Sequence, residues 1–250
     1  MNLDKVLVVN FAVNERTLEL SEHCIKKLGF TNILTLKSDN SFKEKFLQFA
    51  AAAKDEDYDC FLRTDADRLL FDGTLKLVEE WYKNKDLKVV EGKCFDFLMN
   101  KYRGATPHLF SREAMDALYE DSSLMPDTQK PESRFIEKIT DNKKRGWLSL
   151  DTLTNLHDYD QFPSKVCNTI INRISRGHFS YLYDMDYVAT LHQDYQQAFS
   201  AAQGYVSVCG IKEKMDYVDF HLLDKKTKHI SSLEIEEKYE YYKSLYGSLK

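Results

Sequence analysis

Two hydrophobic periods alternate along the first hundred residues, and this alternation predicts strands followed by helices. The short, β-branched run from Val6 to Val13 is typical of a buried strand. After it, Leu20, Cys24 and Leu28 recur every four residues and Gly29 closes the predicted helix. Further apolar runs continue the alternation. They predict strands at Asn32–Leu36, Tyr58–Leu62 and Leu87–Val90.

Two more helices complete the pattern. Ser41 and Glu44 have the spacing of a capping box, and an apolar stripe with helical spacing follows them. Another helix follows Gly73 and is expected to bury Leu75, Val78 and Tyr82. Strands and helices in this order predict an α/β fold, with a mostly parallel sheet covered by helices on both faces.

The rest of the chain is expected to be richer in helices. A helix begins at Pro131, with a C-terminal signal at 143–146, and Trp147–Leu150 forms another strand. An amphipathic helix follows Ser164. The tail 234–246 has tyrosines at helical spacing, which would pack on the domain, pair with a second subunit as a homodimer, or lie on a membrane surface. Packing is favoured, because acidic residues on the tail do not attract anionic lipid.

Composition narrows the classes of function. With 250 residues and 43% hydrophobic residues, the chain can bury a full core. A net charge of −5 argues against nucleic-acid binding through a broad basic face. Five scattered cysteines without a C-x-x-C pair suit reduced thiols in the cytoplasm. The first residues resemble neither a signal peptide nor a transmembrane segment.

Polar residues follow three successive predicted strands, as Asn14-Glu15, Ser38-Asp39-Asn40 and Asp65-Ala66-Asp67. Ligands of parallel sheets collect at the carboxyl ends of the strands, so these positions form a candidate site. In an extended segment Asp65 and Asp67 point the same way, and their carboxylates can converge on one Mg²⁺ or Mn²⁺ ion.

The order strand-NE-helix, strand-SDNS and strand-RTDAD resembles the nucleotide-sugar-binding half of GT-A glycosyltransferases, particularly the family 2-like group. The resemblance implies that Asn14 and Glu15 flank the nucleoside pocket, that Asp39 faces the base, and that Arg63 lies near the donor. It also implies that Asp65 and Asp67 engage ribose and metal. The chain departs from the family at 37–41, where many members have a D-D-G-S form.

Beyond the donor half, Gly104–Glu113 resembles the family segment in which a glycine-containing strand leads into a helix. The helix from Pro131 resembles the one whose first acidic residue is the catalytic base in inverting members. This implies Glu132 as the base, with Asp127 as its rival. Some members place a third metal ligand where His157 stands, and an imidazole ligand favours Mn²⁺ over Mg²⁺.

The resemblance implies a GT-A core at 1–160, with a donor half at 1–100 and an acceptor half at 101–160, and a mainly helical extension at 161–250 packed on it. The expected function is metal-dependent transfer from a nucleotide-diphosphate sugar, first of all a UDP-sugar, to a saccharide or lipid-linked acceptor. The enzyme would be cytoplasmic, either free or peripheral to a membrane. One alternative is a sugar-phosphate nucleotidyltransferase, although 11–16 lacks the glycine-rich basic loop of that class. The other is a non-catalytic carbohydrate-binding module of the same fold.

Overall fold

The computed structural model describes residues 1–55, 57–98, 101–128, 130–175, 193–209 and 233–249. In this part of the chain one seven-stranded sheet has the order β2-β1-β3-β6-β5-β7-β4. The strands are β1 (Val6–Ala12), β2 (Ile33–Lys37), β3 (Cys60–Asp65), β4 (Arg68–Leu70), β5 (Val89–Asp96), β6 (Lys101–Ser111) and β7 (Trp147–His157).

Five of the seven strands run in one direction. β1 is parallel to β2 and β3, and β5 is parallel to β7. β6 lies antiparallel between β3 and β5, and the short β4 is antiparallel to β7 at the edge. The mostly parallel α/β sheet predicted from the sequence is therefore confirmed, with β6 and β4 as the reversed strands.

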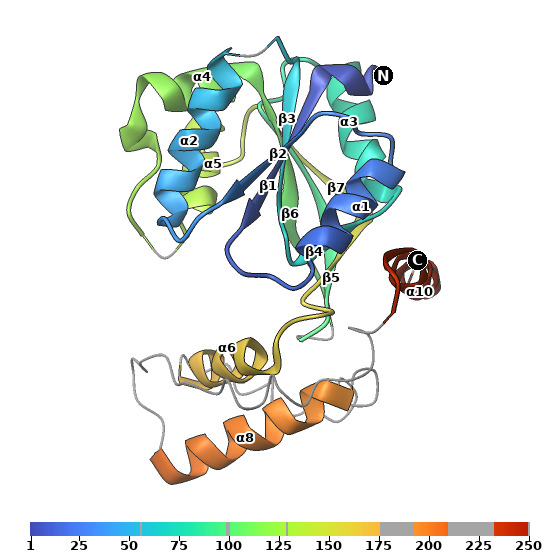
Figure 1. Ribbon diagram of the computed structural model, residues 1–250. Coiled ribbons are helices and arrows are strands. Elements are labelled where there is room, and N and C mark those ends of the chain that lie inside the picture. Colours follow the sequence, from blue (N-terminus) through green and yellow to red (C-terminus); the bar gives the residue numbers. More distant parts are fainter. Residues whose placement is uncertain (56, 99–100, 129, 176–192, 210–232, 250) are drawn as a thin grey trace.

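Helices cover both faces of the sheet (Figure 1). Leu7 and Val9 of β1 face the helices α2, α4 and α5, whereas Val6 and Val8 face α1 and α3. This alternation follows from the period of two residues in a strand. The α-helices are α1 (Leu18–Lys27), α2 (Phe42–Asp55), α3 (Gly73–Lys83), α4 (Arg112–Glu120), α5 (Pro131–Ile139), α6 (Pro163–Ser175), α8 (Gln193–Cys209) and α10 (Ile235–Ser248).

The predicted helix ends are partly confirmed. Ser41 and Glu44 form the capping box, since each side chain accepts a hydrogen bond from the other residue's backbone N–H, at 3.2 and 2.8 Å. Gly29 follows α1 with φ of +90°. The C-terminal signal expected at 143–146 was wrong: α5 ends at Ile139, and the next turn continues through three left-handed residues, 141–143. Basic residues suit a helix end but do not fix its position.

The buried stripe of α3 also differs from the prediction. Leu77, Val78 and Trp81 are buried, whereas Leu75 and Tyr82 are only half-buried. The two half-buried residues still pack against the same cluster, so the helix faces the sheet about one position away from the expected direction. Several positions of this helix are apolar, and tertiary packing selects which of them face the sheet.

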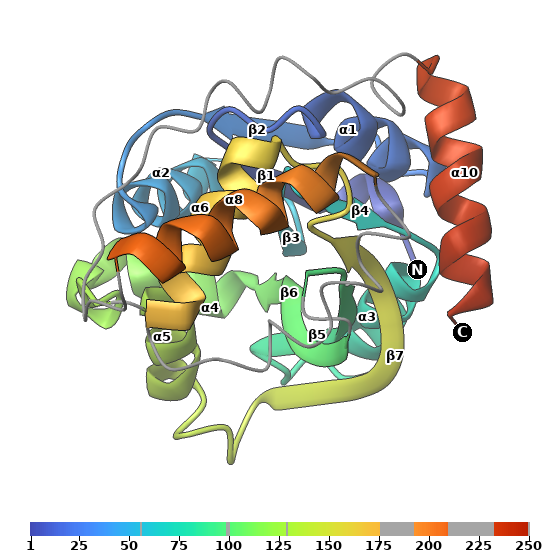
Figure 2. The ribbon, with the colours of Figure 1, turned by 90° about the horizontal axis from the view of Figure 1, so that it is seen from below.

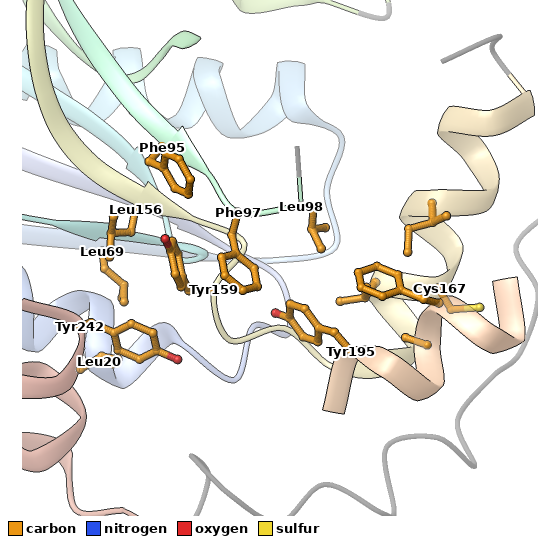
Figure 3. Close-up of a cluster of buried hydrophobic side chains, with 14 of the residues drawn as sticks. Leu20, Leu69, Phe95, Phe97, Leu98, Leu156, Tyr159, Cys167, Tyr195 and Tyr242 are labelled. Carbon is orange, nitrogen blue, oxygen red and sulfur yellow. The ribbon is translucent and has the colours of Figure 1, made fainter. Parts of the chain in front are cut away.

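The C-terminal helices pack outside the two helical layers that cover the sheet. α6 and α8 pack on each other beyond the strand ends (Figure 1), and α10 packs against α1 (Figure 2). Tyr195 of α8 and Tyr242 of α10 join Leu69, Phe95 and the rest of one buried cluster (Figure 3). Within the described residues, Tyr239, Tyr242 and Tyr246 of the tail are buried in this cluster. Residues 176–192 and 210–232 of the predicted extension lie outside the described residues. No described helix is both long enough and apolar enough to cross a membrane.

Candidate functional site

The predicted polar strand ends lie at one edge of the sheet. Phe11 pairs with Asp65, and Ala12 pairs with Lys37, so the ends of β1, β2 and β3 are neighbours. Asp96 pairs with His157, which brings the ends of β5 and β7 to the same edge. The residues after these strands therefore surround a common space, as expected for a ligand site of an α/β sheet.

Three potential metal ligands meet at this edge. Asp67, His157 and Asp158 each offer one ligand atom, and these atoms all lie within 4.8 Å of one another. Asp67 lies in the turn between β3 and β4, and His157 ends β7. The antiparallel pairing of Arg68 with His157 brings the turn and the strand end together. The backbone N–H of Asp158 donates to the carbonyl of Asp67 at 3.2 Å and fixes this approach.

The donor set fits a divalent cation. Oδ1 of Asp67 is buried and has no hydrogen-bond partner in the described part of the chain. Nδ1 of His157 lies 3.1 Å from a carboxylate oxygen of Asp96 and 3.3 Å from one of Asp158, so we assign its proton there. Nε2, which is 3.7 Å from Oδ1 of Asp67, then keeps its lone pair for a metal. One imidazole nitrogen with carboxylate oxygens is a set that Mn²⁺ accepts.

Electrostatics at the group also favour an added cation. Burial raises the pKa of Asp158, and the carboxylates of Asp67 and Asp96 raise it further against the opposing effect of His157. The Lys165 ammonium lies 3.8 Å from Asp67 and 3.2 Å from Glu15 and supplies part of the missing positive charge. A bound cation would neutralise the remaining repulsion between the carboxylates.

Asp65 does not join this group. Its carboxylate is ion-paired with the guanidinium groups of Arg63 and Arg68. Of the three ligands that the sequence predicted, the structure thus brings Asp67 and His157 together, with Asp158 as their neighbour, and places Asp65 with the arginines. Asp158 follows His157 directly and has φ of +61°, a conformation in which aspartate is several-fold enriched. The sequence around Asp158 carried no signal for this role, because its meeting with Asp67 depends on the fold.

The predicted donor residues have different environments. Asn14 and Asp39 are exposed at the edge. Glu15 is tied down, because its carboxylate accepts a hydrogen bond from the backbone of Val13 at 2.6 Å and pairs with Lys165. Arg63 is 1% exposed and lies under the rings of three phenylalanines, away from the exposed rim.

Glu132 is engaged by two cations. Oε2 accepts from Arg63 at 3.2 Å, and Oε1 lies 2.8 Å from Nδ1 of His108. Burial raises the pKa of Glu132, but the charges of Arg63 and His108 outweigh it and hold this pKa at about 2. A carboxylate with so low a pKa accepts protons poorly at neutral pH. These two ion pairs therefore disfavour the role of catalytic base predicted for Glu132.

Two adjoining cavities lie beside these residues. One of about 320 Å³ is lined by Arg63, Asp65, Glu132 and their neighbours. The other, of about 420 Å³, contains the exposed Asp127, the alternative base. Phe42, Glu132 and Ser133 line both, so the two cavities are adjacent.

No protein-family profile and no curated protein matches this sequence. Solved structures match at low identity. A protein from STIV is 13% identical with a TM-score of 0.46, over 60% of this chain and 85% of that one. A glycosyltransferase involved in glycosylation of the major capsid of PBCV-1 is 13% identical with a TM-score of 0.40, over 60% and 93%. A cytidylyltransferase from Leptospira borgpetersenii is 13% identical with a TM-score of 0.40, over 86% and 99%. The similar structures thus include glycosyl- and nucleotidyltransferases.

Proposed function

We propose that this protein is a metal-dependent glycosyltransferase that uses a nucleotide-diphosphate sugar, with a UDP-sugar as the first donor to test. The observation that carries the proposal is the group of Asp67, His157 and Asp158, with an unpartnered buried oxygen on Asp67, at the carboxyl edge of the sheet. Asn14 and Asp39, exposed on the loops of the same edge, are available to the nucleoside.

The residues around the group have separate roles in this proposal. When bound at Asp67, His157 and Asp158, Mn²⁺ or Mg²⁺ supplies positive charge to the diphosphate leaving group. Lys165 lies in the first turn of α6, where the helix dipole disfavours a cation, and Glu15 and Asp67 hold it there. Its ammonium is therefore placed to contact a diphosphate beside the metal ligands. Asp96 orients His157 through Nδ1.

The two adjoining cavities would receive the saccharide or lipid-linked acceptor. A nucleotidyltransferase, by contrast, needs a glycine-rich basic loop after its first strand to hold a triphosphate. Residues 13–17 contain no glycine. The basic residues near this loop are engaged within the protein and do not point to a triphosphate site. Arg16 pairs with Asp160, and Lys45 donates to the carbonyl of Ala12 at 3.0 Å.

The test is a thermal-unfolding screen of nucleoside diphosphates and nucleotide-sugars with Mn²⁺, Mg²⁺ or EDTA. A ligand at a hundred times its dissociation constant stabilises the folded state by about 2.7 kcal/mol, which shifts the melting temperature measurably. We expect one nucleoside diphosphate to stabilise the protein only with metal. This shift should vanish in Asp67→Asn, because the amide has no negative charge and keeps only one of the two carboxylate oxygens.

Asp57→Asn is the matched control, since this aspartate is exposed and, among the described residues, pairs only with Lys5. It should keep the full ligand-induced shift. A metal-dependent shift that persists in Asp67→Asn would refute the metal assignment. Consumption of a nucleoside triphosphate together with a sugar phosphate would assign the protein to the nucleotidyltransferases instead.

A further inference from the structure

The cavity of about 320 Å³ is rich in positive charge, although the whole chain carries a net charge of −5. Its charged lining has three carboxylates and five basic groups, and we call it the cationic cavity. These groups are Asp65, Glu91 and Glu132, and Arg63, Arg68, Arg103, His108 and Lys143. A local excess of cations within an acidic protein raises the concentration of anions at that point.

The basic groups of the floor are used within the protein. Arg63 donates to Thr106 at 2.7 Å and to Glu132, and Arg68 donates to the carbonyl of Thr106 at 3.0 Å. Both arginines also pair with Asp65. These buried groups therefore form a rigid floor and are not the contacts that a ligand would complete.

Two half-exposed basic side chains at the mouth of the cationic cavity have N–H donors left for a ligand. Arg103 directs both Nε and Nη2 to the carboxylate of Asp96, at 2.8 and 2.7 Å, while Nη1 has no hydrogen bond to any described residue. The nearest carboxylate oxygen to the Lys143 ammonium belongs to Glu91, at 3.8 Å, which is beyond hydrogen-bond distance. The side chains of Arg103 and Lys143 are 31% and 38% exposed.

One phenylalanine ring gives this cavity and the next a shared aromatic surface. Phe42 is half-buried and lines both the cationic cavity and the adjoining cavity of about 420 Å³. The face of an aromatic ring packs on the apolar face of a sugar ring. A saccharide, rather than a bare inorganic anion, would use both the aromatic surface and the cations at the mouth.

We propose that the cationic cavity binds the oxyanion of a charged saccharide, a carboxylate or a phosphate, through Arg103 and Lys143. The assignment of this saccharide as the acceptor rests on the proposed glycosyltransferase function. Binding itself does not, because no atom of the metal group is required for it. Arg103 also contacts His157, so Lys143 is the residue whose substitution leaves the metal group untouched.

The experiment compares three sugars that share one ring and differ in the group at carbon 6: glucose and, as the charged hexoses, glucuronate and glucose 6-phosphate. Their dissociation constants are measured by calorimetric titration of the full chain in EDTA, without nucleotide. We expect at least one charged hexose to bind about tenfold or more tightly than glucose, as one charged hydrogen bond provides. The charged hexose that binds more tightly shows whether the natural ligand carries a carboxylate or a phosphate.

In Lys143→Gln this preference for the charged hexose should fall by about tenfold. Lys144→Gln is the matched control, because Lys144 is the exposed neighbour and does not line the cavity. Equal binding of all three hexoses, or an undiminished preference in Lys143→Gln, would overturn the proposal. The same titration in Asp67→Asn should give wild-type values. Loss of metal-dependent nucleotide binding and loss of charged-hexose binding are therefore separate results.

Discussion

His108 shows how single residues set the electrostatics beside the candidate site. Its side chain is 9% exposed and lies between two carboxylates, with Nδ1 2.8 Å from Glu132 and Nε2 3.3 Å from Glu91. Burial lowers its pKa, but the charges and hydrogen bonds of Glu132 and Glu91 outweigh burial and raise the pKa to about 9. The imidazolium therefore persists at neutral pH and holds the two carboxylates together.

This raised pKa predicts a loss of stability in mild alkali. Because the pKa of the folded state exceeds the ordinary value of 6.5, the contribution is fully present below pH 6.5 and disappears as the pH rises through about 9. We expect the free energy of unfolding to fall by roughly 2–4 kcal/mol more in the wild type than in His108→Gln over this range. Urea unfolding at pH 6.5 and 9 measures the difference, and parallel pH profiles would contradict the assignment.

At the scale of elements, the contact of α3 with β7 leaves no room for a side chain. Gly73 begins α3, and a Cβ built on it would lie 1.9 Å from the carbonyl oxygen of Leu153 and 2.8 Å from the Tyr246 hydroxyl. The same hydroxyl donates to Leu153 at 2.6 Å and accepts from the Gly73 N–H at 3.3 Å. One glycine thus allows α3, β7 and α10 to meet.

Gly73→Ala should consequently destabilise the protein by about 1–3 kcal/mol or more, since the methyl group meets backbone that cannot move freely. Gly204→Ala is the opposite case. Gly204 lies inside α8 with no described atom within 4 Å of an added Cβ, and alanine there should stabilise by about 0.5–1 kcal/mol. Denaturant midpoints of the two variants measure both effects. A neutral Gly73→Ala would show that α3 and β7 lie further apart.

At the scale of the molecule, α10 is part of the main core despite its place at the end of the chain. Tyr242 is fully buried and packs edge-on against Tyr159 with ring centroids 5.7 Å apart. The same cluster contains Leu69 of β4 and Leu20 of α1. Because one cluster joins these elements, the described C-terminal helices and the sheet should unfold in a single cooperative transition.

Tyr242→Ala should lower the free energy of unfolding by about 3–5 kcal/mol, because it leaves a large cavity between the sheet and α10. Tyr241→Ala, at the neighbouring position with 44% exposure, should change it by less than about 0.5 kcal/mol. Denaturant unfolding followed by far-ultraviolet circular dichroism and by tyrosine fluorescence measures both variants. Two separate transitions in the wild type would show that the helical extension folds independently.

The sequence alone determined the local features of this protein. The strands from β1 to β3, the helices between them and the capping box at Ser41 all follow from periodicity and end signals close together in the chain. The common location of Asn14, Asp39 and Asp67 also followed from the sequence, because parallel strands must end at one edge of the sheet.

Only the tertiary structure decided which of these residues meet. Asp65 and Asp67 are two residues apart, yet Asp65 pairs with arginines while Asp67 joins His157 and Asp158, about ninety positions away. The cationic cavity likewise combines β3, β5, β6 and the turn after α5. Hydrophobic periodicity is a pattern among residues a few positions apart, so it predicts individual helices and strands. Ion pairs form wherever the fold brings opposite charges together, and that depends on strand order and register, which the local pattern does not contain.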